Sequence, residues 1–96
     1  MEKAEILTRL KKYKESKQLL YNFLRIGVFG SVARNSNSEN SDIDILIEQR
    51  TPDLFTLGTI KTELEEEFGT KIDVIRMHDG LNDSFKKRIE KESIYV

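Results

Sequence analysis

Apolar residues near the start of the chain recur at the spacing of an amphipathic helix. Ile6, Leu10 and Tyr13 lie three to four residues apart, so their side chains would share one helix face. Ser16 is a residue type that often caps a helix. We therefore expect two consecutive N-terminal helices, the second over residues 16–23.

Three short apolar runs follow, at about residues 26–29, 43–48 and 72–75. Runs of this length between turn-forming residues are typical of buried strands. A stretch rich in serine and asparagine, residues 35–41, separates the first two runs. The pattern predicts three strands, with a flexible active-site loop between the first and the second.

Two further helices are expected after the second run. Thr51 followed by Pro52 resembles an N-cap with proline at the first helical position, and Gly69 is a typical helix end. The buried face of this helix is predicted to consist of Leu57, Ile60, Leu64 and Phe68. A last helix is expected from Asn82 or Asp83. These elements together predict a small α/β sheet packed by helices.

Two carboxylates stand at the start of the second predicted strand. Side chains alternate along a strand, so Asp42 and Asp44 project from one face while Ile43 and Ile45 project from the other. Two aspartates this close repel each other unless a cation intervenes, and Mg²⁺ prefers oxygen ligands. The spacing indicates a metal site. The alternative is a solvated strand that carries two aspartates on its exposed face.

The first predicted strand leads directly into Gly30-Ser31. Glycine lets the backbone approach a ligand closely, and the free amides of a helical turn at residues 32–34 would favour an anion. Arg34 could add a charged donor to a phosphate group. A Gly-Ser pair alone is usually only a turn, but its place next to the aspartates favours a phosphate site.

A third aspartate interrupts the last apolar run. Asp73 shares one strand face with Ile75, whereas Ile72 and Val74 share the other. If this strand lies beside the Asp42–Asp44 strand, Asp73 completes a cluster of three carboxylates. It could then position or deprotonate an attacking hydroxyl. The alternative is a charge at a sheet edge that deters aggregation.

Together these segments resemble the signature of the DNA-polymerase-β-like nucleotidyltransferase superfamily: Gly30-Ser31, a spacer, Asp42-Ile43-Asp44 and a later aspartate, Asp73. The short chain and its Gly-Ser-Val-Ala-Arg opening are similar to the minimal nucleotidyltransferases, called MNT or MntA. One departure is Asn35, where many relatives have glycine. The resemblance implies an α/β (α+β) fold, in which helices flank a small mixed sheet with the catalytic carboxylates on one exposed face.

The resemblance also implies a role for each motif residue. Gly30 and Ser31 would hold the triphosphate of ATP. Asp42 and Asp44 would ligate two Mg²⁺ ions. Asp73 would complete the metal site beside the acceptor hydroxyl.

A partner is implied as well. Minimal nucleotidyltransferases are typically encoded beside a small all-helical HEPN protein that acts as a toxic ribonuclease. The resemblance implies that the nucleotidyltransferase is the antitoxin and transfers AMP to a tyrosine of that toxin. Two alternatives remain open: a non-catalytic antitoxin that blocks its partner sterically, and nucleotidyl transfer to a small molecule held by a separate subunit.

Length and charge narrow the function classes further. The 96 residues suffice for one domain, residues 1–96, and so small a core would gain stability from homo- or hetero-oligomerisation. A net charge of −1 gives no electrostatic footprint for nucleic-acid binding. Without cysteines, a signal-peptide core or a membrane-spanning apolar stretch, the chain is expected to be cytoplasmic.

Overall fold

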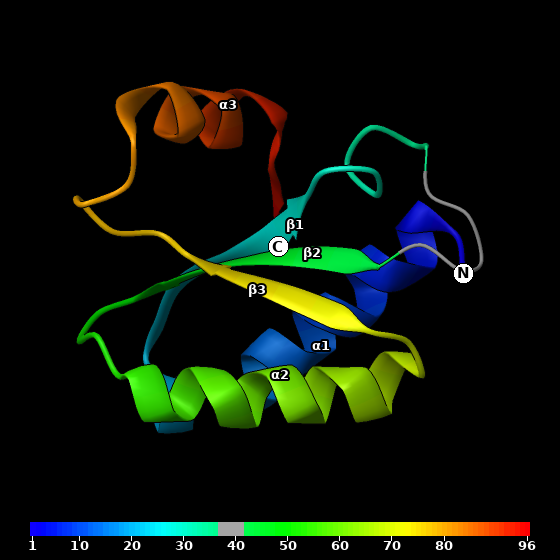
Figure 1. Ribbon diagram of the computed structural model, residues 1–96. Coiled ribbons are helices and arrows are strands. Elements are labelled where there is room, and N and C mark those ends of the chain that lie inside the picture. The colour runs from blue at the N-terminus through cyan, green and yellow to red at the C-terminus, as the bar shows by residue number, and fades with distance from the viewer. Residues whose placement is uncertain (37–41) are drawn as a thin grey trace.

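The computed structural model describes residues 1–36 and 42–96. Of the predicted loop at residues 35–41, residues 37–41 lie outside the described residues. Along the chain the elements are α1 (Lys3–Tyr21), β1 (Phe23–Phe29), β2 (Ile43–Gln49), α2 (Leu54–Phe68), β3 (Ile72–Arg76), α3 (Asp83–Glu92) and β4 (Ile94–Tyr95) (Figure 1). No helix in the described part of the chain is long and apolar enough to cross a membrane.

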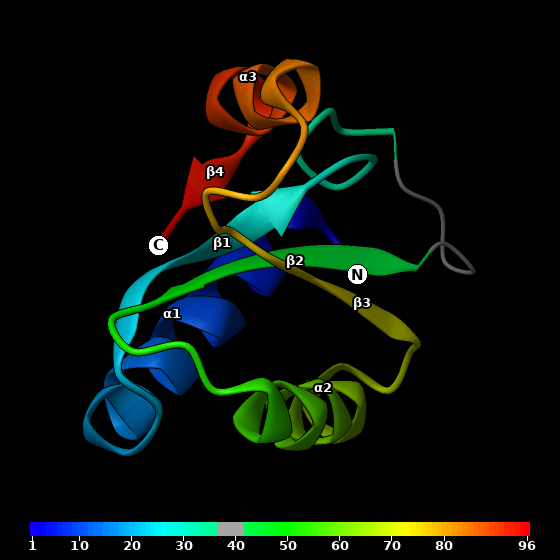
Figure 2. The same cartoon turned by 60° about the vertical axis from the view of Figure 1, so that its left-hand side comes forward.

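The strands form one mixed sheet in the order β3-β2-β1-β4. β1 pairs antiparallel with both β2 and β4, whereas β2 and β3 run parallel. α1 and α2 cover one face of the sheet, and α3 lies on the other (Figures 1 and 2). The expected fold class, a small mixed sheet flanked by helices, is confirmed.

The two faces of the sheet bury two separate apolar clusters. The larger one lies between the sheet and α1 and α2, and it includes Leu10, Ile45 and Ile60. The smaller one consists of Phe29, Leu46, Met77 and Ile89. Alternation along β2 explains the division, because neighbouring side chains of a strand point to opposite faces.

The N-terminal helix differs from its prediction, since α1 is continuous from Lys3 to Tyr21. Ser16 does not cap a second helix, because its hydroxyl donates to the Tyr13 carbonyl oxygen (3.1 Å) inside α1. Asn22 ends the helix in the left-handed conformation, with φ of 55°. Phe23, predicted to be helical, is instead the buried first residue of β1.

The start of α2 was also predicted wrongly. Asp53 is the N-cap, because its side chain accepts hydrogen bonds from the amides of Phe55 and Thr56. Thr51 and Pro52 therefore precede the helix. The predicted end is confirmed, since Gly69 caps α2 with φ of 65° and donates its amide to the Glu65 carbonyl oxygen.

The last two elements include one that was not predicted. α3 begins after Asn82, whose side chain accepts hydrogen bonds from the amides of Ser84 and Phe85, as expected. β4 follows and pairs with β1 at Gly27. A Cβ atom at Gly27 would collide with the Ile94 carbonyl oxygen, so glycine at this position lets β4 add to the sheet.

Candidate active site

Two of the three predicted aspartates are direct neighbours in the sheet. Asp44 is the second residue of β2 and Asp73 is the second residue of β3. The parallel register pairs Asp44 with Asp73, so their backbones lie roughly 4.8 Å apart and their side chains leave the same face. The predicted adjacency of these two residues is confirmed, and Asp42 stands immediately before β2.

The carboxylates share their sheet face with α3. Leu46 follows Asp44 by two residues and Ile75 follows Asp73 by two, so each lies on the same face as its aspartate. Both belong to the small apolar cluster around Ile89. Leu46 and Ile75 therefore pack under α3, directly after the aspartates that precede them on the same face.

Crowding of negative charge changes the acidity of Asp44. Burial raises the pKa of the Asp44 carboxyl above its ordinary value, and the charges of Asp73 and Asp42 raise it further. Arg34 acts in the opposite direction. Charge introduced by a cation at this position would relieve the repulsion.

Gly30 brings the turn after β1 against Asp44. Its φ is 71°, in the left-handed region that side chains rarely adopt. A Cβ atom at this position would also collide with Oδ2 of Asp44. Both observations favour glycine, and they place the backbone of the predicted phosphate turn directly beside the predicted metal ligand.

The residues after Gly30 form a single turn and not a helix. The amides of Arg34, Asn35 and Ser36 donate to the carbonyl oxygens of Gly30 (3.1 Å), Val32 (3.1 Å) and Ser31 (2.8 Å). The amides of residues 31–33 are outside these hydrogen bonds, as in the first turn of a helix.

The left-handed conformation of Asn35 explains the departure from the family pattern. Its φ is 60°, and this region suits glycine or asparagine better than other residues. Asparagine can therefore occupy the position at which the resemblance led us to expect glycine.

Sequence reasoning missed two charged neighbours of the site. Nζ of Lys71 lies 3.8 Å from Oδ2 of Asp42, and Nη1 of Arg34 lies 3.7 Å from Oε2 of Glu92 at the end of α3. Lys71 directly precedes the third apolar run, so its nearness could have been inferred once β2 and β3 were paired. The Glu92 contact had no signal in the sequence.

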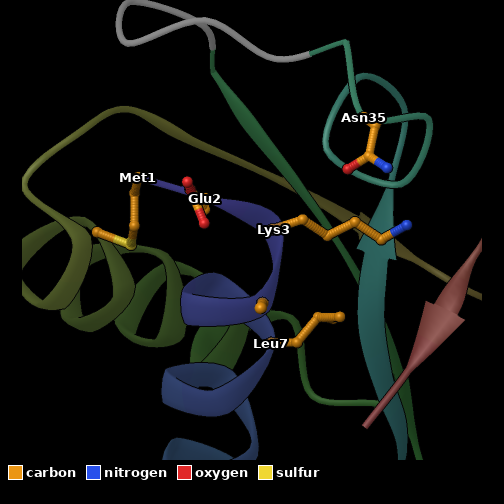
Figure 3. A pocket seen from close by; sticks show the side chains of 6 residues that line it. Met1, Glu2, Lys3, Leu7 and Asn35 are labelled. Carbon is orange, nitrogen blue, oxygen red and sulfur yellow. The ribbon is translucent and has the colours of Figure 1, made fainter.

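A pocket of about 500 Å³ lies on the other side of the turn. It is lined by the N-terminal end of α1 and by Asn35 (Figure 3). Lys3 connects the start of α1 to the turn after β1, because its Nζ donates a hydrogen bond to the Ala33 carbonyl oxygen (3.2 Å). Among the described residues, the three predicted aspartates do not line this pocket.

The geometry agrees with comparisons with known proteins. The sequence model of the family described as "Polymerase beta, Nucleotidyltransferase" matches residues 6–96. The chain belongs to this nucleotidyltransferase family. It is 38% identical over 94 residues to the Methanocaldococcus jannaschii protein named "Putative protein adenylyltransferase MJ0128", covering 97% of this chain and 96% of that protein.

Other relatives of this nucleotidyltransferase agree. The "Protein adenylyltransferase MntA" of Thermococcus cleftensis is 31% identical over 93 residues, covering 96% of this chain and 93% of that protein. A solved structure described as "Structure of putative minimal nucleotidyltransferase" is similar, with a TM-score of 0.79, 28% identity and coverage of 98% and 95% of the two chains. The predicted enzyme class and the likeness to minimal nucleotidyltransferases are confirmed.

A more distant structure shares the fold alone. The solved structure described as "Crystal structure of the toxin-antitoxin with AMP-PNP" has a TM-score of 0.74 at 17% identity. The alignment covers 92% of this nucleotidyltransferase and 69% of that chain.

The donor atoms of the site suit a hard divalent cation, but the side chains do not form a finished metal site. Carboxylate oxygens are the ligands that Mg²⁺ prefers, and Asp44 and Asp73 present them side by side. Within residues 1–36 and 42–96, no three histidine, cysteine, aspartate or glutamate side chains are grouped closely enough to hold a metal. The predicted three-carboxylate metal cluster stays a prediction.

Proposed function

We propose that this nucleotidyltransferase transfers AMP from ATP to a tyrosine hydroxyl of a helical HEPN-type toxin, in a Mg²⁺-dependent reaction, and acts as its antitoxin. The observation that carries the proposal is the register that pairs Asp44 with Asp73 beside the Gly30 turn. The relative named Protein adenylyltransferase MntA supports the reaction type. The toxin-antitoxin structure with AMP-PNP supports the nucleotide and the kind of partner.

Each residue of the site has a task in the proposed reaction. The backbone at Gly30 and Ser31 binds the triphosphate, with additional charge from Arg34. Asp42, Asp44 and Asp73 are the residues that would hold two Mg²⁺ ions. When bound, these ions neutralise negative charge on the reacting phosphates.

Asp73 also orients the acceptor. The tyrosine oxygen attacks the α-phosphorus of ATP and forms a new O–P bond. The bond between the α-phosphorus and the bridging oxygen breaks, and pyrophosphate leaves with the electron pair. The carboxylate of Asp73 accepts the proton of the tyrosine hydroxyl.

We also propose that residues 1–96 work as one catalytic domain in the cytoplasm, without binding nucleic acid directly. The net charge of −1 supports the last point. The partner would then supply the surface around the acceptor tyrosine.

The decisive experiment measures the intact mass of the partner toxin after incubation with this chain, ATP and Mg²⁺. We expect a gain of one or more AMP units that is lost in the double variant Asp42→Asn, Asp44→Asn. A stable complex without any mass gain, for ATP and for the other nucleoside triphosphates, would contradict adenylyl transfer.

A steric antitoxin is the second candidate, and two observations favour it. Asp42 lies 3.8 Å from Lys71, and the described acidic side chains do not form a metal-holding group. If binding alone silences the toxin, the triple variant of Asp42, Asp44 and Asp73 to asparagine would rescue growth as well as the wild type. If transfer is required, this variant would fail while still binding the toxin.

A further inference from the structure

Five large hydrophobic side chains are exposed at the end of the molecule opposite the carboxylates. We call them the end patch: Leu19 (96% exposed), Leu20 (64%), Leu24 (42%), Leu54 (68%) and Phe55 (93%). They belong to the last turn of α1, the start of β1 and the start of α2. Exposed apolar patches larger than a few hundred Å² mark interaction sites.

The elements that carry the patch are neighbours in the fold. The C-terminal end of α1 and the N-terminal end of α2 lie side by side (Figures 1 and 2). Leu20 and Pro52 line one shallow pocket between them, and Leu24 and Pro52 line the next. Leu20 and Leu24 therefore lie on either side of Pro52, while Leu19, Leu54 and Phe55 are exposed on the neighbouring helix ends.

The first half of α2 lacks charged residues, although 34% of the residues in the chain are charged. From Leu54 to Ile60 it has no charged residue, and Gly58 lies on its exposed side. A Cβ atom at Gly58 would meet nothing within 4 Å. Glycine is unfavourable inside a helix, and nothing in this chain requires it here, whereas a closely packed neighbouring helix would.

The patch lies away from the carboxylates at which the acceptor protein must bind, an argument that rests on the proposed function. The acceptor hydroxyl must reach Asp44 and Asp73 at the N-terminal ends of β2 and β3. The patch lies at the opposite ends of the strands, where β1 begins and β2 ends. A protein that contacts only the carboxylate end of the molecule would leave the patch uncovered.

Area and charge suit a second copy of the chain. If they were buried completely, the five residues would contribute at most roughly 700 Å², against the ~800 Å² that each partner contributes to a standard interface. Arg50 and Asp53 lie at the border of the patch with opposite charges, and neither has an ion-pair partner among the described residues. A two-fold axis that passes between these two residues would bring Arg50 of each copy towards Asp53 of the other.

We propose that two copies of this chain associate through the end patch. The dimer is symmetric, with α2 of one copy packed near Gly58 against α2 of the other. The two carboxylate sites then lie at the outer ends of the dimer, each accessible to its own acceptor.

Sedimentation equilibrium of the chain alone, without nucleotide or partner, tests the proposal separately from adenylyl transfer. We expect twice the mass of one chain at micromolar concentration. The double variant Leu19→Ser, Phe55→Ser should raise the dimer Kd by about tenfold or more. The control variant Lys87→Ser, on exposed α3, should leave the Kd unchanged.

A second variant tests the helix contact without removing apolar area. Gly58→Leu adds a side chain where α2 meets its copy, so it should also give monomers, while circular dichroism shows an intact helix. A wild-type chain that stays monomeric up to high concentration would overturn the proposal. So would a dimer that both variants leave unchanged, or a patch that becomes protected from hydrogen exchange only when the toxin is added.

Discussion

Asp44 and Ile45 are consecutive residues of β2, yet they belong to opposite faces of the sheet with different roles. Ile45 is fully buried in the large core under α1 and α2. Asp44 is half-buried on the α3 face, next to Asp73 and the Gly30 turn. The large core can hold the sheet in place, so the other face can carry closely spaced negative charges that oppose folding.

This division is expected where a site needs unfavourable electrostatics. Repelling carboxylates cost stability, and proteins accept such a cost at functional positions when the rest of the structure fixes the backbone. In this chain one strand, β2, carries both the repelling carboxylate of Asp44 and the buried side chain of Ile45 that stabilises the fold. Substitutions at adjacent positions should therefore separate activity from stability.

The largest effect is expected from Asp44→Asn. Loss of this carboxylate should lower the rate of AMP transfer by at least about 100-fold, while the fold is retained. The rate is measured with labelled ATP and the partner toxin. The matched control is Asp79→Asn, an exposed aspartate beyond β3, which should transfer AMP at the wild-type rate. Wild-type activity of Asp44→Asn would show that the carboxylates on the α3 face of the sheet are not needed for transfer.

Ile45→Ala is expected to reduce stability more than it reduces the transfer rate. Removing this buried side chain should lower the free energy of unfolding by about 2–5 kcal/mol, as measured by urea denaturation. Ile75→Ala, at a half-buried position on the α3 face, should cost less. Equal losses at the two positions would mean that the two faces contribute alike to stability.

A pair of glycines sharpens the comparison. Gly30 and Gly69 have similar φ angles, 71° and 65°, but only a Cβ atom at Gly30 would meet the Asp44 carboxylate. Both alanine variants should lose about 1–3 kcal/mol of stability through backbone strain. Gly30→Ala should in addition lower transfer by at least about tenfold, because it displaces Asp44. If Gly69→Ala loses as much activity, the effect is strain alone.

The smallest effect concerns the acidity of Asp44. Burial and the charges of Asp73 and Asp42 raise its pKa, so Asp73→Asn should lower this pKa towards its ordinary value. Carboxyl carbon NMR titration measures the change directly, with Asp79→Asn as the control. An unchanged Asp44 pKa would mean that the two paired carboxyls do not interact.

The same shift predicts the direction of a stability change. A carboxyl whose pKa is higher in the folded than in the unfolded state binds a proton more tightly when folded. Its contribution therefore favours folding below the unfolded-state pKa, and this contribution is lost as the pH rises through the raised pKa. Asp44→Asn should accordingly unfold at a slightly higher temperature than the wild type at neutral pH.

Local signals in the sequence were sufficient for much of the fold. The apolar runs located β2 and β3, and Gly69 and Asn82 marked an end of α2 and the start of α3. Errors arose where two local signals competed. Ser16 and Pro52 suggested helix starts, but the hydroxyl of Ser16 bonds within α1, and Asp53 caps α2 in place of Thr51.

Long-range contacts were beyond these signals. β4 has only two residues, and its pairing depends on the close approach that Gly27 allows. The contact of Arg34 with Glu92 joins the turn after β1 to the end of α3. Neither contact leaves a pattern in the sequence around it.

The sequence by itself determined which side chains share a face, because alternation along a strand is local. It set Asp44 and Asp73 apart from the buried isoleucines beside them. Only the tertiary structure decided that β3 lies parallel to β2 in the register that pairs these two aspartates. α2 connects β2 to β3 along the chain, and Ile60 and Leu64 hold it against the sheet. The register therefore depends on the length of α2 and on how this helix packs, because both limit where β3 can begin.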